Sequence, residues 1–283
     1  MGIRTVLDSR GLRPQKKWGQ HFLTDPRILE TIADAAEVQA TDTILEIGPG
    51  LGHLTRVLAR RARQVVSVEI DAGLSEQLRK EFALASNVTI RQGNFLDAAP
   101  IEWLGKSITG AELSSAPVAI PFKIVANLPY YITSAILRHI LEAVVKPRVI
   151  VVMVQREVAQ RIVARPPTMN LLAVSVQCFA QPRIMRTIRA GAFYPPPKVD
   201  SAVVRMDVFE PARIAPGETT RFFEIVHAGF GTRRKQLRNA LAQGLGRSPQ
   251  AITLALERAG VDPTRRAETL TLDEWIELYR ELA

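Results

Sequence analysis

A short stretch with the residue types needed to hold a planar amine lies near the middle of the chain, at Asn127-Leu128-Pro129-Tyr130. Asn127 offers an acceptor oxygen and two N–H donors, and Tyr130 offers an aromatic face and a hydroxyl group. Pro129 disfavours the helical conformation at Leu128, so the turn stays extended and the Leu128 carbonyl can face a ligand. This set suits a planar heterocycle that carries an exocyclic amine. The alternative is an ordinary strand-to-helix turn capped by an asparagine.

The elements that must position this turn are short apolar strands. Residues 122–126 are mostly apolar and follow a proline, which is typical of a buried strand. A similar strand at 43–47 runs directly into Gly48-Pro49-Gly50-Leu51-Gly52 and then into a helical pattern. Strand, glycine turn and helix bring the backbone close to a nucleotide-like ligand at the carboxyl edge of a sheet. The spacing of Gly48, Gly50 and Gly52 is not that of dinucleotide-binding turns, which disfavours a dinucleotide-dependent dehydrogenase.

Two further expected strands, at 64–68 and 88–91, also end in residues that can bind a nucleoside. Glu69 follows the first, where a carboxylate can accept both ribose hydroxyls. Asn94 and Phe95 follow the second, where Asn94 can bind an adenine amine or Phe95 can stack on the ring. The alternative for these positions is a structural turn and a surface acid.

The remaining pattern favours an α/β fold, Rossmann-like, with helices on both faces of the sheet and a small all-helical C-terminal domain. We expect domains at 1–211 and 212–283, with a linker at 211–219 between the sheet and the C-terminal helices. An Asp25-Pro26 cap predicts a helix that starts there. The other expected elements are helices at 134–144 and 155–164, strands at 148–154, 171–179 and 202–209, irregular segments at 1–24 and 98–120, and helices through 220–283.

The composition favours a polyanionic partner. The 283-residue chain has 37 Lys and Arg against 28 Asp and Glu, a formal net charge of +9. Nucleic acid is a better match than a membrane, because no apolar run approaches the roughly 18 residues that a bilayer span needs. Cys178 is the only cysteine, which excludes an intramolecular disulfide and suits a reducing, cytoplasmic location. The sequence has no Cys/His cluster with metal-ligand spacing, so no metal is expected.

Two basic segments are candidates for nucleic-acid contact. The alternative for each is a basic surface that contacts only solvent. The N-terminal arm carries Lys16 and Lys17 beside Trp18. The second segment lies between two helical patterns and carries Arg233, Arg234, Lys235 and Arg238. A third segment, 193–201, begins with Phe193 and holds three prolines, which favours a rigid wall of the site over a polyproline ligand.

In combination, the motifs resemble those of the ribosomal RNA adenine N6-dimethyltransferases, most closely the bacterial small-subunit enzymes. Two positions depart from that family: Asn94 stands where aspartate is usual, and His21 where asparagine is more frequent. The motifs that carry the resemblance are Gly19–Leu23, Glu46–Gly52, Glu69–Asp71, Asn127–Tyr130, Phe193–Ser201, Arg233–Asn239 and Arg266–Leu270.

The resemblance implies S-adenosyl-L-methionine as cofactor and dimethylation of two adjacent adenosines near the 3′ end of 16S rRNA, within the small (30S) subunit or its precursor. It implies that Asn127 and Leu128 hold the adenine amine, with Pro129 shaping the turn and Tyr130 and Phe193 as faces for the base. The implied cofactor contacts are His21, Leu23, Gly48, Gly50, Gly52, Glu69, Asn94, Phe95 and Asn127. We expect a monomer. The alternatives are an assembly factor that has lost turnover and an erythromycin-resistance-type methylase of the large subunit.

Overall fold

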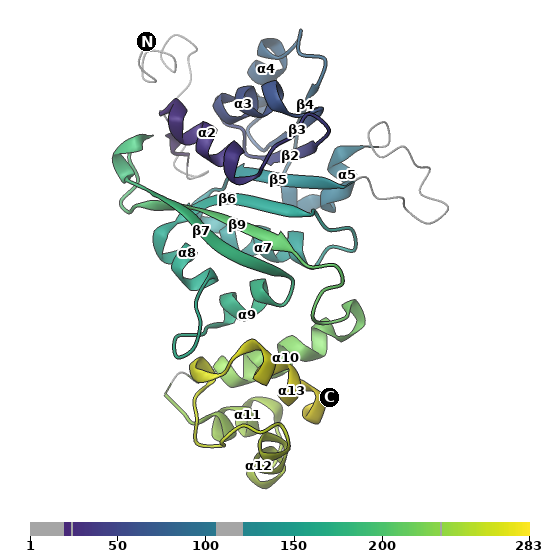
Figure 1. The fold of residues 1–283 in the computed structure, drawn as a ribbon, viewed down its shortest axis with the longest axis vertical. Helices are drawn as coiled ribbons and strands as arrows, with labels where there is room; N and C mark the ends of the chain where they lie inside the picture. The colour runs from purple at the N-terminus through teal and green to yellow at the C-terminus, as the bar shows by residue number, and fades with distance from the viewer. Residues whose placement is uncertain (1–19, 24, 106–120, 233) are drawn as a thin grey trace, which may run out of the picture. The chain divides into compact units, whose positions relative to one another are not determined.

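The computed structural model describes residues 20–23, 25–105, 121–232 and 234–283. It divides into two compact units (Figure 1). The first consists of the described residues up to Ala159 together with Arg183–Val208, and the second of Gln160–Pro182 and Phe209–Ala283.

The first unit is organised around a seven-stranded sheet of order β4-β3-β2-β5-β6-β9-β7. Its first five strands are parallel, and β9 runs antiparallel to β6. The strands are β2 (Thr43–Ile47), β3 (Gln64–Glu69), β4 (Val88–Gln92), β5 (Phe122–Asn127), β6 (Val149–Gln155), β7 (Ala180–Ile188) and β9 (Ser201–Val208). The expected α/β class is confirmed. The parallel register places the carboxyl ends of β2, β3 and β5 at one edge.

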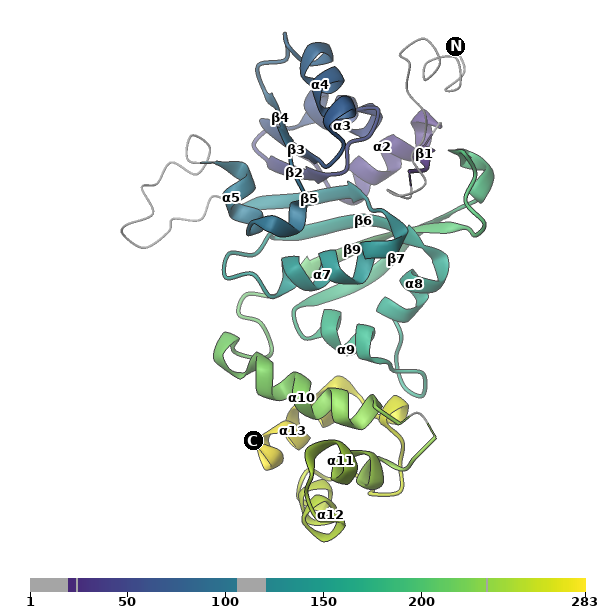
Figure 2. The same ribbon diagram turned by 180° about the vertical axis from the view of Figure 1, so that it is seen from behind.

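Helices cover both faces of this sheet, as expected. In Figure 1 helix α2 lies in front of the sheet and α7 behind it, and Figure 2 shows the reverse. Asp25 caps α2 by accepting a hydrogen bond from the Arg27 N–H at 2.9 Å, as its sequence predicts. The helices of this unit are α2 (Pro26–Ala35), α3 (His53–Arg61), α4 (Ala72–Glu81), α5 (Pro100–Leu104), α7 (Thr133–Leu141) and α8 (Arg156–Ile162), the last ending in the second unit.

A two-stranded ribbon lies outside the main sheet. Strands β1 (Phe22–Leu23) and β8 (Phe193–Tyr194) pair antiparallel, with Phe22 opposite Tyr194 and Leu23 opposite Phe193. We expected an irregular segment and a loop at these places. Strands of two residues have no periodic pattern, so only the pairing of segments far apart in the sequence reveals them.

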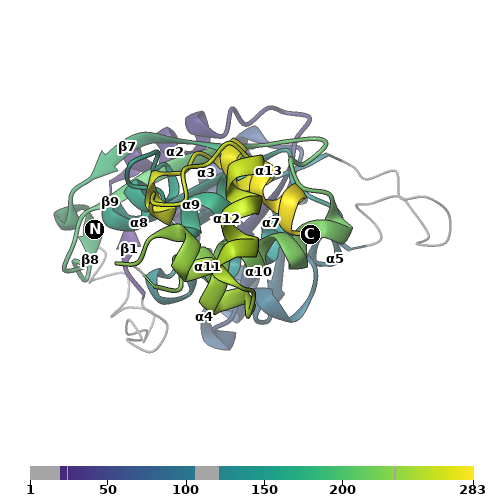
Figure 3. The same cartoon turned by 90° about the horizontal axis from the view of Figure 1, so that it is seen from below.

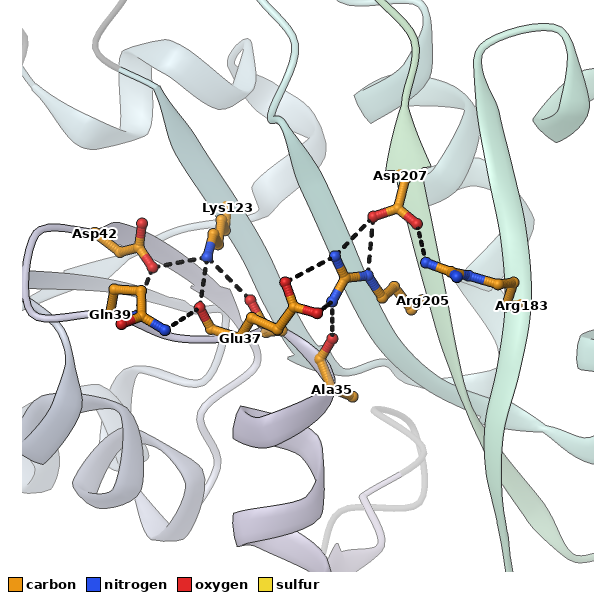
Figure 4. A network of polar contacts seen from close by, with 9 residues as sticks. Ala35, Glu37, Gln39, Asp42, Lys123, Arg183, Arg205 and Asp207 are labelled. Carbon is orange, nitrogen blue, oxygen red and sulfur yellow. Dashed lines mark hydrogen bonds and ion pairs between the residues drawn. The ribbon is translucent and has the colours of Figure 1, made fainter.

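A polar network holds the C-terminal end of α2 near the amino end of β5, away from the carboxyl ends of the parallel strands (Figure 4). Lys123 on β5 donates to the carbonyl oxygen of Glu37 and to the carboxylate of Asp42, both at 2.8 Å. Arg205 on β9 donates to the Ala35 carbonyl oxygen at 2.9 Å and pairs with the Glu37 carboxylate at 2.8 Å. Lys123 stands at the start of β5, whereas Asn127 stands at its end, so this network is structural.

The second unit is helical and is built around Phe222 and Trp275, both fully buried. Successive helices contact one another from α10 to α13, and Figure 3 shows α11, α12 and α13 together. The helices are α9 (Leu171–Gln177), α10 (Thr219–Phe230), α11 (Leu237–Leu245), α12 (Pro249–Arg258) and α13 (Leu272–Leu282).

The prediction of a strand at 171–179 is wrong, because this segment forms α9. Asn170 caps the helix, its side chain accepting from the Ala173 N–H at 3.1 Å. The apolar run in this segment fits a buried strand and a buried helix equally, and packing against α10 decides between them. The following strand, β7, was missed because most of its residues are exposed and it lacks an apolar pattern.

The division into units differs from the expected boundary between 1–211 and 212–283. Residues 160–182 group with the C-terminal helices. The Phe179 ring lies 6.4 Å from that of Phe223 on α10, and the Phe209 N–H donates to the Phe179 carbonyl oxygen at 2.8 Å. The proline and glycine residues of the linker indicate where the chain changes direction, but they cannot reveal that residues 160–182 pack with the C-terminal helices.

Candidate functional site

A single pocket collects most of the predicted site residues at the carboxyl edge of the sheet. Turns after β2, β3, β4 and β5 form its walls, and the β1 strand of the ribbon contributes from the side. The predicted residues that line it are His21, Leu23, Gly48, Gly50, Glu69, Asn94, Phe95, Asn127, Leu128, Pro129 and Tyr130. Gly52 and Phe193 are not among the lining residues.

The glycine turn after β2 requires left-handed backbone at three positions. Gly48, Gly50 and Gly52 have φ angles of +68°, +58° and +74°, which side-chain-bearing residues rarely adopt. A Cβ atom on Gly50 would lie 3.1 Å from the Phe22 ring. A Cβ atom on Gly52 would lie 2.7 Å from the Leu78 side chain. Gly48 and Gly50 therefore shape the pocket, whereas Gly52 permits close packing of α3 on α4.

Glu69 at the end of β3 is held rigidly by the backbone. Its side chain accepts hydrogen bonds from the Gly50 and Asp71 N–H groups, each at 3.0 Å. Only 4% of the residue is exposed, and this burial raises the pKa of the carboxyl above its usual value, against the effect of the two backbone donors. Each oxygen keeps a second lone pair for a hydroxyl donor, so the geometry fits the ribose role that the sequence suggests.

Glu46 is a buried acid of the pocket whose role the sequence reasoning missed. One carboxyl oxygen accepts from the Thr55 hydroxyl at 2.7 Å and from the Ser67 hydroxyl at 2.6 Å. The other oxygen has no hydrogen-bond partner among the described residues. Burial raises the pKa of Glu46 to about 7. The signal in the sequence was an acid inside the otherwise apolar strand 43–47.

Asn94 performs a local structural task beside the pocket. Its side-chain oxygen accepts from the Leu96 N–H at 3.3 Å, and its side-chain nitrogen donates to the Asp97 carboxylate at 2.8 Å. These contacts cap the short 3₁₀ helix η2 (Phe95–Asp97). Phe95 is buried and packs edge-to-face on His139, with ring centroids 5.5 Å apart. Asn94 keeps one N–H donor on its side-chain nitrogen and one lone pair on its side-chain oxygen for an adenine ring.

Asn127 ends β5 with its amide orientation fixed. The side-chain nitrogen donates to the His21 carbonyl oxygen at 3.3 Å, so the side-chain oxygen is left to accept a hydrogen bond. The next residue, Leu128, is anchored by its own N–H, which donates to the Met153 carbonyl oxygen at 3.2 Å. His21 Nδ1 lies 2.7 Å from the Pro195 carbonyl oxygen and therefore carries the hydrogen. These contacts tie the segment before β1 and the loop after β8 to the Asn127 turn.

Tyr130 lines the pocket with its aromatic ring, and its hydroxyl group is anchored to a neighbouring side chain. Its hydroxyl lies 2.5 Å from the Ser201 hydroxyl at the start of β9. Burial raises the pKa of the Tyr130 hydroxyl, against the effect of the Ser201 hydrogen bond. The ring that the structure places against Tyr130 is that of His21. The sequence suggested Phe193 as the second aromatic face, but Phe193 is only 4% exposed and packs in the core.

The basic residues are only partly within the described structure. Lys16, Lys17 and Arg233 lie outside the described residues. Arg234 and Lys235 are exposed in the second unit, just before α11, where Lys235 donates to the Gln243 side chain at 2.8 Å. Arg238 is half-buried in the first turn of α11.

The described residues contain neither a candidate metal cluster nor a membrane-spanning helix. In that part of the chain no group of three or more His, Cys, Asp or Glu side chains is arranged to hold a metal ion. Among the helices described, none is long and apolar enough to cross a membrane.

Known proteins resemble this chain over nearly its whole length. A family model described as ribosomal RNA adenine dimethylase matches residues 11–283. "Ribosomal RNA small subunit methyltransferase A" from Dehalococcoides mccartyi strain 195 is 46% identical, covering 96% of this chain and 89% of the relative. The protein of the same name from Anaeromyxobacter dehalogenans strain 2CP-C is 42% identical, covering 99% and 97%.

Solved structures show the same fold. The crystal structure of the 23S rRNA methyltransferase ErmE has a TM-score of 0.71 and 28% identity, covering 92% of this chain and 99% of that one. A dimethyladenosine transferase from Plasmodium falciparum has a TM-score of 0.74 at 22% identity, covering 91% and 96%. At that identity the second likeness concerns the fold alone.

Proposed function

Because this chain belongs to the ribosomal RNA adenine dimethylase family, we propose that its substrate is the 16S rRNA of the small ribosomal subunit. The chain is an S-adenosylmethionine-dependent rRNA adenine dimethyltransferase. The finer proposal is that it dimethylates two adjacent adenosines near the 3′ end of 16S rRNA, within the 30S subunit or its precursor.

The observation that carries the small-subunit assignment is the similarity over the full chain. The relatives named for the small subunit are 46% and 42% identical, compared with 28% for the large-subunit enzyme ErmE. The second unit contributes to this match, because the family model extends to residue 283. Large-subunit rRNA is the alternative substrate, because the ErmE fold also matches nearly the whole chain.

The pocket has features that fit S-adenosylmethionine, whose bound sulfonium supplies an electrophilic methyl group. The Gly48–Gly50 turn lets the backbone approach a ligand, and Glu69 offers acceptor lone pairs at the end of the neighbouring strand. We assign the methionine portion to the glycine turn, with His21 and Leu23 beside it, and the ribose to Glu69. Asn94 and Phe95 border the place where the adenine ring would lie.

The chain's own residues can prepare the target amine. The exocyclic nitrogen of adenine is a weak nucleophile, because its lone pair is conjugated with the ring. The Asn127 side-chain oxygen is oriented to accept one amine hydrogen, and we assign the other to the Leu128 carbonyl. Two acceptors favour a pyramidal nitrogen with its lone pair free to react. Tyr130 stacks on the base, and most of the barrier reduction comes from positioning.

The substrate RNA must be held while one base leaves its stack to enter the pocket. We assign phosphate contacts to Lys16 and Lys17 and to Arg233, Arg234, Lys235 and Arg238. We propose that residues 1–211 carry the reaction and 212–283 contribute RNA binding. The protein would act as a monomer in the cytoplasm, where subunits are assembled.

The test is methyl transfer from labelled S-adenosylmethionine to unmethylated small subunits, with large subunits in parallel. We expect label in small-subunit RNA alone, recovered as N6,N6-dimethyladenosine after digestion. Label in large-subunit RNA instead would transfer the assignment to the alternative substrate. Tight binding to small subunits without label would indicate an assembly factor and contradict the proposal.

A further inference from the structure

Tyr131 is an exposed aromatic residue at the rim of the pocket. It belongs to the 3₁₀ helix η3 (Tyr130–Ile132) and is one of the lining residues. Its residue surface is 56% exposed, whereas the other Phe, Tyr and Trp residues in the described part of the chain are buried or half-buried. An exposed aromatic side chain forgoes the free energy gained on burial.

The ring is presented from a fixed backbone. The Ile132 N–H donates to the Pro129 carbonyl oxygen at 3.3 Å, and the Thr133 hydroxyl donates to the same oxygen at 3.2 Å. Within the described residues, the Tyr131 side chain has no hydrogen bond, ring contact or ion pair. The polar contacts that position it are therefore those of the main chain, and the exposed part of its ring is available to a ligand.

The two neighbouring tyrosines differ in their surroundings. Tyr130 is half-buried and bonded to Ser201, whereas Tyr131 is exposed. Successive residues of a 3₁₀ turn point about 120° apart, because the turn repeats every three residues. The two rings therefore present separate faces, one within the pocket and one at its rim.

We propose that Tyr131 is a stacking platform for the nucleobase next to the target adenine, an inference that rests on the proposed function. Flipping one base out of a strand deprives its neighbour of a stacking partner, and an exposed tyrosine can replace that partner. The ring thereby favours RNA in which the nucleotide next to the target carries a base over RNA in which that base is missing. For two adjacent adenosines, each serves as the neighbour while the other is methylated.

Stacking has a defined effect on the rate. A base stacked on an aromatic side chain contributes about 1–3 kcal/mol, so Tyr131→Ala should lower kcat/KM by about 5- to 150-fold. Tyr131→Phe keeps the ring and should stay near the wild type. Tyr131→Leu keeps apolar bulk without a planar ring and should resemble Tyr131→Ala.

The test combines these variants with RNA that lacks the neighbouring base. Small subunits are reconstituted with an abasic nucleotide beside one adenosine, and methyl transfer to that adenosine is measured. We expect the wild type to lose activity on the abasic subunit and Tyr131→Ala to show no further loss. Independent losses that multiply would overturn the proposal, as would full activity of Tyr131→Ala on the intact subunit.

Two controls separate this inference from the proposed function and from misfolding. Leu84→Ala removes another exposed apolar side chain, 101% exposed in the turn after α4, and should change nothing. Calorimetry with S-adenosylmethionine should give the same affinity for Tyr131→Ala and wild type, which also shows that the variant is folded. If the wild type methylates no small-subunit RNA, the proposed function fails. If it does and Tyr131→Ala does equally well, only the stacking role fails.

Discussion

The imidazole of His21 is stacked on the Tyr130 ring, with centroids 5.7 Å apart and planes inclined by 22°. His21 makes two further contacts besides this stacking. Its Nδ1–H donates to the Pro195 carbonyl oxygen, and its own carbonyl oxygen accepts from the Asn127 side-chain nitrogen. The ribbon formed by β1 and β8 is thus connected to the turn to which we assign the target amine. His21 links the predicted cofactor side of the pocket to its base side.

Replacing His21 tests this link. His21→Ala removes both the ring contact and the hydrogen bond to Pro195, and we expect kcat/KM to fall by about 2- to 10-fold, since an aromatic pair contributes about 0.5–1.5 kcal/mol. His21→Asn restores a donor for Pro195 and should recover part of the loss. Steady-state kinetics on small subunits measures both. Equal activity of all three proteins would contradict a positioning role.

Asn127→Ala should remove methyl transfer while RNA binding remains. The side-chain oxygen is the acceptor that the structure leaves available, and we expect kcat to fall roughly 10²–10³-fold, the size of the effect when one oriented polar group is lost from an oxyanion hole. Single-turnover transfer and subunit binding should be measured on the same preparation. If binding falls as far as transfer, Asn127 acts in RNA binding and not in orienting the amine.

Glu69→Ala should weaken S-adenosylmethionine binding, measured by calorimetry. The raised pKa of Glu69 also predicts how the affinity changes with pH, because only the ionised carboxylate accepts hydrogen bonds from two ribose hydroxyls. The wild-type affinity should therefore fall as the pH is lowered through that raised pKa. Glu69→Gln should bind weakly without this pH dependence. An unchanged affinity in Glu69→Ala would remove the residue from the site.

Glu46 should make stability depend on pH. Its folded-state pKa is about 7, above the value of 4.5 for a free side chain. The folded protein therefore binds more protons than the unfolded chain between these values, so the contribution of Glu46 is fully present below about pH 4.5 and lost as the pH rises through about 7. Glu46→Gln should remove this contribution. Chemical unfolding of both proteins between pH 4.5 and 7.5 measures the difference, and parallel curves would disprove the assignment.

The basic segment before α11 should contribute salt-sensitive RNA affinity. Replacing Arg233, Arg234 and Lys235 with alanine removes three cations, and we expect weaker subunit binding with a smaller dependence on salt, because fewer counterions are released. Replacing Arg79 and Lys80, two exposed cations on α4, is the control for the loss of positive charge elsewhere on the surface. The measurement is the slope of the logarithm of affinity against that of salt concentration. An unaltered slope would return the segment to a solvated surface.

The sequence by itself determined the order of elements that forms the pocket. The apolar strands at 43–47, 64–68 and 122–126 are continuous and short, and the residues after two of them specify turns, because glycine allows left-handed backbone and proline fixes φ. Parallel pairing then brings Gly48, Glu69 and Asn127 to one edge. The family follows from the same motifs.

The tertiary structure decided what local patterns leave open. The β1 and β8 strands are too short to carry a periodic signal, and residues 171–179 satisfy the patterns of a strand and of a helix equally. Only the assembled chain shows that Phe193 is enclosed in the core while His21 lies against Tyr130. The same holds for Tyr131, whose type is visible in the sequence. Its exposure depends on which of two adjacent rings the packing buries.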